Sequence, residues 1–196
     1  MSSAALKRIS WEEYVELERR AIEKSQFFDG ELFAMAGGTF NHSLVATNFT
    51  REAGNALKGS GCRVNSSDLR ILCPSGLGTY PDASIVCGEP QFQGEKQETL
   101  LNPVAIVEVL SPTTEGFDRG KKFEHYQSLR SLQEYVLISQ DHVWIDHFAR
   151  QSQTRKWLLT TYSDLEGRLE LPAVNISLSI AEIYAKVMFE TAATDE

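Results

Sequence analysis

The sequence predicts an α+β (mixed α/β) fold in which a central mixed sheet is flanked by helices. The chain has 196 residues, 42% of them hydrophobic and 23% charged, so it can bury a core without disulfide or metal supports. Helix-start signals stand near both ends, at Ser10 and Ser179. Apolar runs of strand length lie between them, which is typical of a single α+β domain over residues 1–196.

The first third of the chain is predicted to form a helix, a hairpin and a second helix. Ser10 and Glu13 make a capping box, so a helix should span residues 11–23. Asp29-Gly30 between two apolar runs predicts a tight hairpin over residues 27–33. Asn41 can cap a helix that continues to residue 58. Its expected apolar face consists of Val45, Phe49, Ala53, Ala56 and Leu57.

Strands dominate the rest of the prediction. They are expected at residues 63–72, 82–87, 104–110, 134–139, 143–150 and 156–162, with helices at 118–129 and 179–189. Residues 89–102 are predicted to be a polar loop and 191–196 a flexible tail. Four aromatic side chains of the later strands are expected to lie in the core, and a subunit interface is the alternative. They are Trp144, Phe148, Trp157 and Tyr162.

Composition and charge exclude several classes of protein. There are 19 basic and 27 acidic side chains, for a net charge of −8, which disfavours tight non-specific binding of nucleic acid. Two local basic clusters still occur: Arg51, Lys58, Arg63 and Arg70, and further along Arg119, Lys121, Lys122 and Arg130. No apolar run is long enough to span a membrane and no signal core begins the chain, so we expect a cytoplasmic protein with no membrane partner.

The three cysteines, Cys62, Cys73 and Cys87, are an odd number without a CxxC pair. This pattern predicts buried free thiols in a reducing compartment. A zinc site is disfavoured, because none of the four histidines has ligand spacing to a cysteine.

Glu108 does not fit its surroundings. It stands in residues 104–110, the most apolar run of the chain, which predicts a central strand buried on both faces. A buried carboxylate is costly unless a cation or hydrogen bonds compensate it. A salt bridge or an emerging strand end would explain Glu108 structurally, and a metal ligand or acid–base group would explain it functionally.

Asp82 has a similar setting, since it follows Pro81 where a predicted strand begins. A turn aspartate after proline is common, so the pair alone is weak evidence. If the two strands are neighbours, Asp82 and Glu108 would converge into an oxygen-ligand site suited to Mg²⁺ or Mn²⁺.

The predicted helix 118–129 carries Asp118, Lys122 and Tyr126 at spacings of four, so all three share one face. A solvated amphipathic face is the simpler explanation. The alternative is that this face returns to Glu108 and brings the Lys122 ammonium to a bound phosphate, where it could stabilise developing charge.

These residues together resemble the Uma-two family, a group classed among candidate restriction endonucleases within the PD-(D/E)XK nuclease superfamily. The similarity rests on Pro81-Asp82, on Glu108-Val109-Leu110-Ser111-Pro112 and on Asp118-x3-Lys122-x3-Tyr126. It extends to Trp11-Glu12-Glu13-Tyr14 and Asp29-Gly30-Glu31-Leu32, and it covers residues 8–188. The resemblance implies a restriction-endonuclease-like core with an N-terminal helix and hairpin.

The resemblance also implies a metal-dependent endonuclease that hydrolyses phosphodiester bonds in DNA. Asp82 and Glu108, with the Val109 carbonyl, would hold Mg²⁺ or Mn²⁺, and Lys122 would position or deprotonate the attacking water. The superfamily expects its lysine two residues after the acid, where this chain has Leu110. The family is understood to supply it from the following helix. Lys121 adjoins Lys122; Lys122 is favoured for its shared face with Asp118 and Tyr126.

Further residues have supporting roles in this hypothesis. Asp118 and Tyr126 would hold the site, and Ser111 would shape the turn after the strand. His42 and Glu31 could line the mouth, although a helix-start hydrogen bond and an exposed hairpin position are the simpler alternatives. The resemblance implies a homodimer, because cutting a duplex takes two active sites.

A second hypothesis is a catalytically silent or partner-dependent binding module on the same fold, since fold does not guarantee chemistry. An acyl-transfer hydrolase built on Ser111 is disfavoured because the chain has no G-x-S-x-G elbow.

Overall fold

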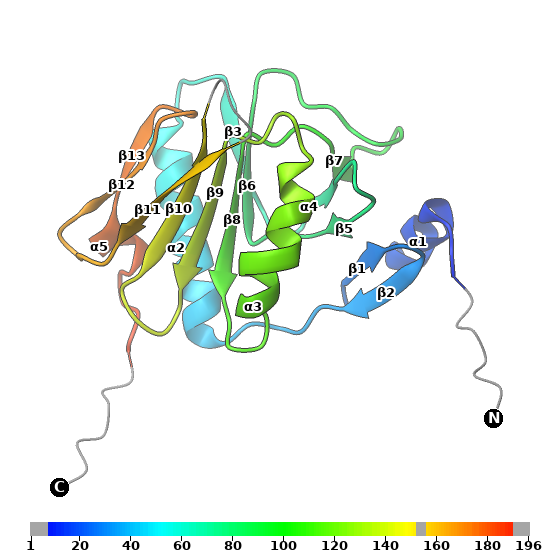
Figure 1. Ribbon diagram of the computed structural model, residues 1–196, viewed down its shortest axis with the longest axis horizontal. Coiled ribbons are helices and arrows are strands. Elements are labelled where there is room, and N and C mark those ends of the chain that lie inside the picture. The colour runs from blue at the N-terminus through cyan, green and yellow to red at the C-terminus, as the bar shows by residue number, and fades with distance from the viewer. Residues whose placement is uncertain (1–7, 152–155, 190–196) are drawn as a thin grey trace, which may run out of the picture.

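A six-stranded mixed sheet forms the centre of the protein (Figure 1). The computed structural model describes residues 8–151 and 156–189. The strands of this sheet are β3 (Cys62–Ser66), β6 (Ala83–Cys87), β8 (Ala105–Leu110), β9 (Glu134–Ser139), β10 (Ile145–Arg150) and β11 (Trp157–Tyr162). Their spatial order is β11-β10-β9-β8-β6-β3. Only the β8–β9 pair of this sheet is parallel, so the sheet is mixed, as predicted.

A second sheet of five short strands adjoins the first, so the prediction of one sheet is wrong. Its strands are β1 (Ser25–Phe28), β2 (Glu31–Ala34), β4 (Arg70–Leu72), β5 (Gly78–Thr79) and β7 (Thr99–Leu100), in the order β2-β1-β5-β4-β7. The expected strand 63–72 breaks into β3 and β4, which belong to different sheets. Strands as short as β5 and β7 show no alternation that a sequence pattern could detect, and β7 lies in the predicted loop 89–102.

The N-terminal helix and hairpin are confirmed. In α1 (Trp11–Glu18), Ser10 Oγ accepts from the Glu13 amide at 3.1 Å and the Glu13 carboxylate accepts from the Ser10 amide at 2.8 Å. The helix ends earlier than predicted, because the Glu18 carboxylate accepts from the Ser25 amide and hydroxyl and joins the helix to β1. Asp29 and Gly30 both have positive φ, 50° and 81°, as the tightest hairpin turn requires.

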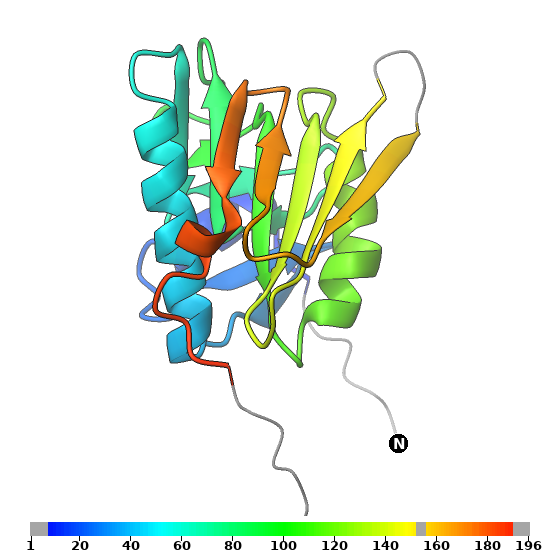
Figure 2. The same cartoon turned by 90° about the vertical axis from the view of Figure 1, so that its left-hand side faces the viewer.

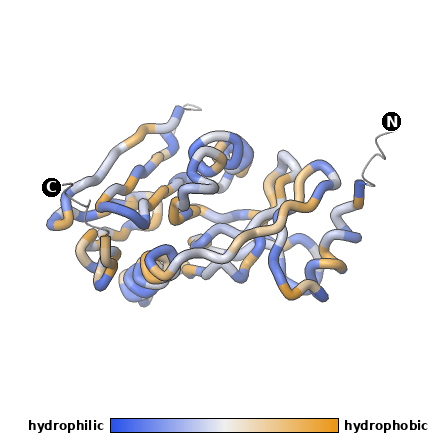
Figure 3. The backbone as a smooth tube through the Cα atoms, turned by 90° about the horizontal axis from the view of Figure 1, so that it is seen from below, coloured by the Kyte–Doolittle hydropathy of each residue, from blue (hydrophilic) through white to orange (hydrophobic). Residues whose placement is uncertain are grey.

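Helix α2 (Phe40–Ala56) is capped by Thr39, so the prediction of an Asn41 cap is wrong. Thr39 is extended, and its hydroxyl accepts from the His42 amide at 3.1 Å, whereas the Asn41 side chain donates to the Met188 carbonyl. Ala56 is exposed, against prediction, while Val45, Phe49, Ala53 and Leu57 are buried. Hydrophobic and hydrophilic residues alternate along the helices (Figure 3), as amphipathic segments require.

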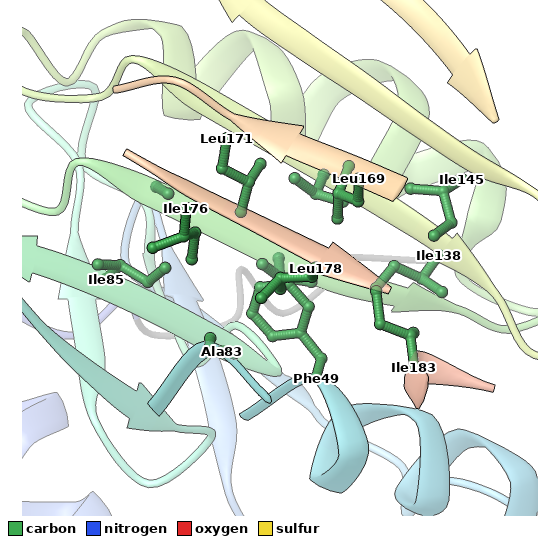
Figure 4. Close-up of a cluster of buried hydrophobic side chains, with 14 of the residues drawn as sticks. Phe49, Ala83, Ile85, Ile138, Ile145, Leu169, Leu171, Ile176, Leu178 and Ile183 are labelled. Carbon is green, nitrogen blue, oxygen red and sulfur yellow. The ribbon is translucent and has the colours of Figure 1, made fainter. Parts of the chain in front are cut away.

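Both faces of the six-stranded sheet are covered (Figure 2). Helix α2 and the hairpin of β12 (Arg168–Leu171) and β13 (Ile176–Ser179) cover one face. Leucine and isoleucine side chains of this hairpin pack onto the sheet beside Phe49 (Figure 4). The sequence does not predict either strand. The final helix, α5 (Ile180–Ile183), begins at the predicted Ser179 cap but is shorter than the expected 179–189. The predicted tail 191–196 lies outside the described residues.

A helical segment with three parts covers the other face. It consists of α3 (Glu115–Phe117), the π-helical turn η1 (Asp118–Lys122) and α4 (Phe123–Gln127). A single helix over 118–129 is the prediction, so the segment starts earlier and contains an irregular turn. Such π turns are frequent at functional sites, because the extra residue shifts the side chains of one helix face.

Two other sequence predictions are corrected. Cys62 and Cys87 lie opposite each other in β3 and β6 and form a disulfide, so only Cys73 is a free buried thiol. The register of the strand pairing brings the two cysteines together, and their spacing in the sequence does not reveal this. The prediction of a reducing compartment rested on three free thiols, and two of them are in the disulfide. Arg70 is no surface cation, because it is buried among the rings of Trp11, Tyr14 and Tyr80.

The aromatic residues of the later strands are divided between core and surface. Phe148 and Trp157 are partly buried against Phe123, and Tyr162 packs on the opposite core, whereas Trp144 is exposed. Within residues 8–151 and 156–189, no helix has the length and apolar character to cross a bilayer.

One buried carboxyl group makes stability depend on pH. Glu134 accepts from the Ala173 amide at 2.8 Å, and its other oxygen has no hydrogen-bond partner among the described residues. Burial raises the pKa of Glu134 from 4.5 to about 7 and lowers the pKa of the adjacent His147 to about 4.

We predict that Glu134→Gln stabilises the protein at alkaline pH only. The raised pKa means that the folded state favours the protonated carboxyl. The contribution of Glu134 to folding stability is therefore fully present below pH 4.5 and is lost as pH rises through about 7. Glutamine does not titrate, so the variant should gain about 3 kcal/mol over wild type by pH 8. Urea unfolding at pH 4.5 and pH 8 measures this. Glu166→Gln, at an exposed position, is the control; an equal gain at both pH values would contradict the prediction.

Candidate active site

Strand β8 presents Glu108 to the helical segment. Ala105, Val107 and Val109 face the α2 side, and the alternate residues Ile106 and Leu110 face the other core, as the two-residue period of a strand requires. Glu108 shares the face of Ile106 and Leu110 and is only 4% exposed. The prediction of a strand buried on both faces is confirmed.

Two side chains of the helical segment contact Glu108, and a third contacts one of these two. Its Oε1 accepts from the Tyr126 hydroxyl at 2.7 Å and lies 2.8 Å from Lys122 Nζ. Lys122 also lies 2.9 Å from Asp118 Oδ1. Asp118, Lys122 and Tyr126 therefore share one face that returns to β8, and all three are buried. Lys121 is exposed, so Lys122 is the lysine beside the carboxylates.

Asp82 reaches the same strand from the start of β6. Its Oδ2 accepts from the Val109 amide at 2.7 Å and lies 3.4 Å from His42 Nε2. The β6–β8 pairing, with Ala83 opposite Val107, places Asp82 beside the end of β8. Asp82 and Glu108 thus come from neighbouring strands, as predicted.

Three acidic side chains lie in this region: Glu108 and Asp118 contact Lys122, and Asp82 contacts His42. Burial raises the pKa of Glu108 to about 8; Lys122 opposes the rise, whereas Asp118 and Asp82 add to it. Burial acts to lower the pKa of Lys122, but Glu108 and Asp118 outweigh it and raise this pKa above the usual value. Lys122 is therefore a stable ammonium at neutral pH.

One oxygen of each of the two carboxylates Asp82 and Glu108 is without a hydrogen bond in the described residues. The contacts to Glu108 fall on Oε1 and those to Asp82 on Oδ2, so Glu108 Oε2 and Asp82 Oδ1 have no hydrogen-bond partner among the described residues. In the same residues, no group of three or more Asp, Glu, His or Cys side chains forms a complete cage. Mg²⁺ does not require such a cage, because it usually takes one or two protein carboxylates and keeps several waters.

His42 is held against Asp82 by the connector that precedes α2. Burial acts to lower the pKa of His42, but Asp82 outweighs it and the net pKa is raised. A Cβ at position 38 would lie 2.5 Å from His42 Nδ1, so any residue larger than glycine would displace the imidazole ring. The His42 amide also donates to the Thr39 cap, which is the simpler alternative, a helix-start hydrogen bond; a role at the mouth of the site stays a prediction.

We predict that Gly38→Ala displaces the His42 ring from Asp82. The added methyl would push the flexible imidazole away, and loss of such a supporting contact should lower activity about tenfold. Gly61→Ala is the control, because no atom lies within 4 Å of its Cβ position. Proton NMR of His42 should show its pKa falling in Gly38→Ala only; an unchanged titration would contradict the prediction.

The remaining predicted residues lie apart from the carboxylates. The Ser111 hydroxyl bonds Thr113 and Thr114, and its carbonyl accepts from the Glu115 amide, so it shapes the turn before α3. Glu31 is exposed in β2, which agrees with the simpler alternative of an exposed hairpin position.

Gln140 is a residue of the site region that the sequence does not predict. It donates to the Leu110 carbonyl at 3.0 Å and accepts from the Thr39 hydroxyl. It thereby ties the end of β8 to the cap of α2. No spacing pattern indicates it, because its partners are 30 and 101 residues away.

The protein has a mixed α/β fold. It matches a crystal structure from Anabaena variabilis titled "a putative nuclease belonging to DUF820", with a TM-score of 0.69, 17% identity, and coverage of 89% of this chain and 98% of that one. A family model gives the particular group. Residues 11–181 match Uma2, described as "Putative restriction endonuclease", and the chain belongs to this family.

Two curated relatives from Synechocystis sp. resemble most of the chain. The uncharacterized protein slr1290 is 37% identical over 188 residues, which cover 95% of this chain and 97% of that protein. The uncharacterized protein sll1609 is 33% identical over 177 residues, covering 90% and 99%.

Proposed function

We propose that this protein is a Mg²⁺- or Mn²⁺-dependent endonuclease that hydrolyses phosphodiester bonds, with DNA as the substrate. The observation that carries the proposal is the recessed cluster of Asp82 and Glu108, each with one free oxygen, beside the buried Lys122 ammonium. A buried carboxylate whose pKa is shifted by burial and by neighbouring charges, as that of Glu108 is, is a candidate functional group. Membership of the Uma2 family supports the same class of reaction.

Each side chain of the site has its own role in the proposed reaction. Asp82 Oδ1, Glu108 Oε2 and the Val109 carbonyl would hold the cation, which when bound supplies Lewis acidity and a water of lowered pKa. Lys122 stays protonated, so it orients the water and stabilises charge on a phosphoryl oxygen rather than removing a proton. Tyr126 fixes Glu108, Asp118 fixes Lys122, and His42 fixes Asp82.

A cleavage assay with supercoiled plasmid and single-stranded DNA tests this function. Wild type should cut with Mg²⁺ or Mn²⁺ and not with EDTA. Asp82→Ala should be inactive, whereas Asp164→Ala, at an exposed carboxylate, should retain activity. Cleavage that survives in Asp82→Ala would refute the proposed site.

A catalytically silent binding module is the second candidate, and one observation favours it. Lys122 already pairs with Glu108 and Asp118, so the cluster can exist as a structural ion pair. Calorimetric Mg²⁺ titration discriminates the two: the nuclease proposal expects binding that Asp82→Ala removes, and a silent module need not bind.

A homodimer is part of the proposal. Strand β2 is at a sheet edge with Leu32 and Phe33 exposed, and Phe40 is exposed close by in the chain. Edges of this kind can pair with a second chain. Light scattering should give twice the mass of the chain, and a monomer at all concentrations would contradict this.

A further inference from the structure

We infer that the cavity beside the site receives a single, unpaired strand of nucleic acid rather than an intact duplex. This inference rests on the proposed function. It concerns a cavity of about 970 Å³ that opens on Asp82 and His42, which we call the α2 groove. Its walls are the outer face of α2 (Ser43, Thr47, Thr50 and Arg51) and the connector of residues 35–38.

The walls of the α2 groove suit a sugar-phosphate backbone. The α2 wall carries the hydroxyls of Ser43 and Thr47, and Ser66 and Ser67 add two more, whereas the Thr50 hydroxyl donates to the Ala46 carbonyl. The opposite wall, Ala36-Gly37-Gly38, has almost no side chains. None of its three backbone amides donates to an acceptor within the described part of the chain. Small walls and unused donors allow a phosphate chain to approach closely.

The depth at which Glu108 and Asp82 lie below the surface favours an unpaired strand. The Glu108 residue is only 4% exposed and the Asp82 side chain 19% exposed, so the proposed reacting centre lies below the protein surface. A duplex is stiff and keeps its paired strands together, so its backbone bends little toward a recessed centre. A single strand can bend into a groove and track along it.

Charge predicts a modest, measurable electrostatic contribution. Two cations, Lys24 and Arg51, line the α2 groove together with the acidic Glu23. Lys24 pairs with Asp68, and Arg51 pairs with Glu52 and Glu182; such exposed pairs are weak enough for a phosphate to replace them. Two phosphate contacts predict a slope of about −1.4 for log affinity against log salt on a single strand.

Fluorescence anisotropy with Ca²⁺ in place of Mg²⁺ tests binding without cleavage. The probes are a labelled oligodeoxynucleotide of about 12 nucleotides, the RNA of the same sequence, and the DNA duplex. We expect the single strands to bind at least about tenfold more tightly than the duplex. The DNA and RNA arms show which sugar is preferred. Arg51→Ala should reduce the salt slope by about 0.7.

Thr47→Trp fills the α2 groove and should weaken single-strand binding about tenfold. Asn55→Trp is the matched control, because Asn55 is also exposed on α2 but does not line the groove; it should bind like wild type. Equal or tighter duplex binding, or a Thr47→Trp variant that binds like wild type, would overturn the inference. An absence of cleavage with Mg²⁺ would instead refute the proposed function, because anisotropy does not depend on hydrolysis.

Discussion

Glu108→Gln is expected to lower phosphodiester cleavage by at least about 10²–10³-fold without loss of thermal stability. The substitution keeps the shape of the side chain but removes the charge that would hold the cation. Stability should be maintained or increased, because burial raises the pKa of Glu108 and makes its charged form costly in the fold. Lys122 keeps Asp118 as its partner, so no isolated charge remains.

Initial cleavage rates over a Mg²⁺ series and melting curves at pH 8 measure these two effects. Glu124→Gln is the matched control, since Glu124 is exposed in α4; it should resemble wild type in both measurements. A Glu108→Gln variant that cuts at the wild-type rate would exclude Glu108 as a metal ligand. One that melts far below wild type would show that its charge serves stability first.

Lys122→Met is expected to destabilise the protein by about 3–5 kcal/mol, because it removes one partner of a buried ion cluster. Lys122 Nζ lies 2.8 Å from Glu108 and 2.9 Å from Asp118. Without this ammonium, the two buried carboxylates face each other uncompensated. Lys121→Met is the neighbouring control and should change stability by no more than about 0.5 kcal/mol, because Lys121 is exposed.

Urea unfolding at neutral pH measures the loss, and a double substitution tests its cause. Lys122→Met combined with Glu108→Gln should recover part of the stability, because one of the two repelling charges is gone. If Lys121→Met were the more damaging substitution in both stability and cleavage, the assignment of Lys122 would be wrong.

Local patterns in the sequence were sufficient to predict the central part of the site. The apolar run 104–110 indicated a fully buried strand, and Glu108 stood out within it for that reason. Helical spacing predicted that Asp118, Lys122 and Tyr126 share a face, which is correct even though η1 makes the turn irregular. A carboxylate in an apolar run and a face of polar residues are signals that a few neighbouring residues carry.

Contacts between distant segments were not predictable in this way. The Thr39 cap, the Gly38–His42 approach and the Gln140 bridge involve atoms that only folding brings together. The same holds for the Cys62–Cys87 disulfide and for the division of the strands into separate sheets. Each depends on pairing register, which a short strand does not specify by its own sequence.

The sequence by itself therefore determined the strand that carries Glu108, the helix face that carries Lys122 and the family resemblance. Only the tertiary structure decided that this face returns to this strand, and that Asp82 and His42 join it through the Val109 amide and the Gly38 connector. The physical reason is range. Periodicity and capping act over a few residues, whereas the site is assembled by burial, charge pairing and close packing between elements that are far apart in the chain.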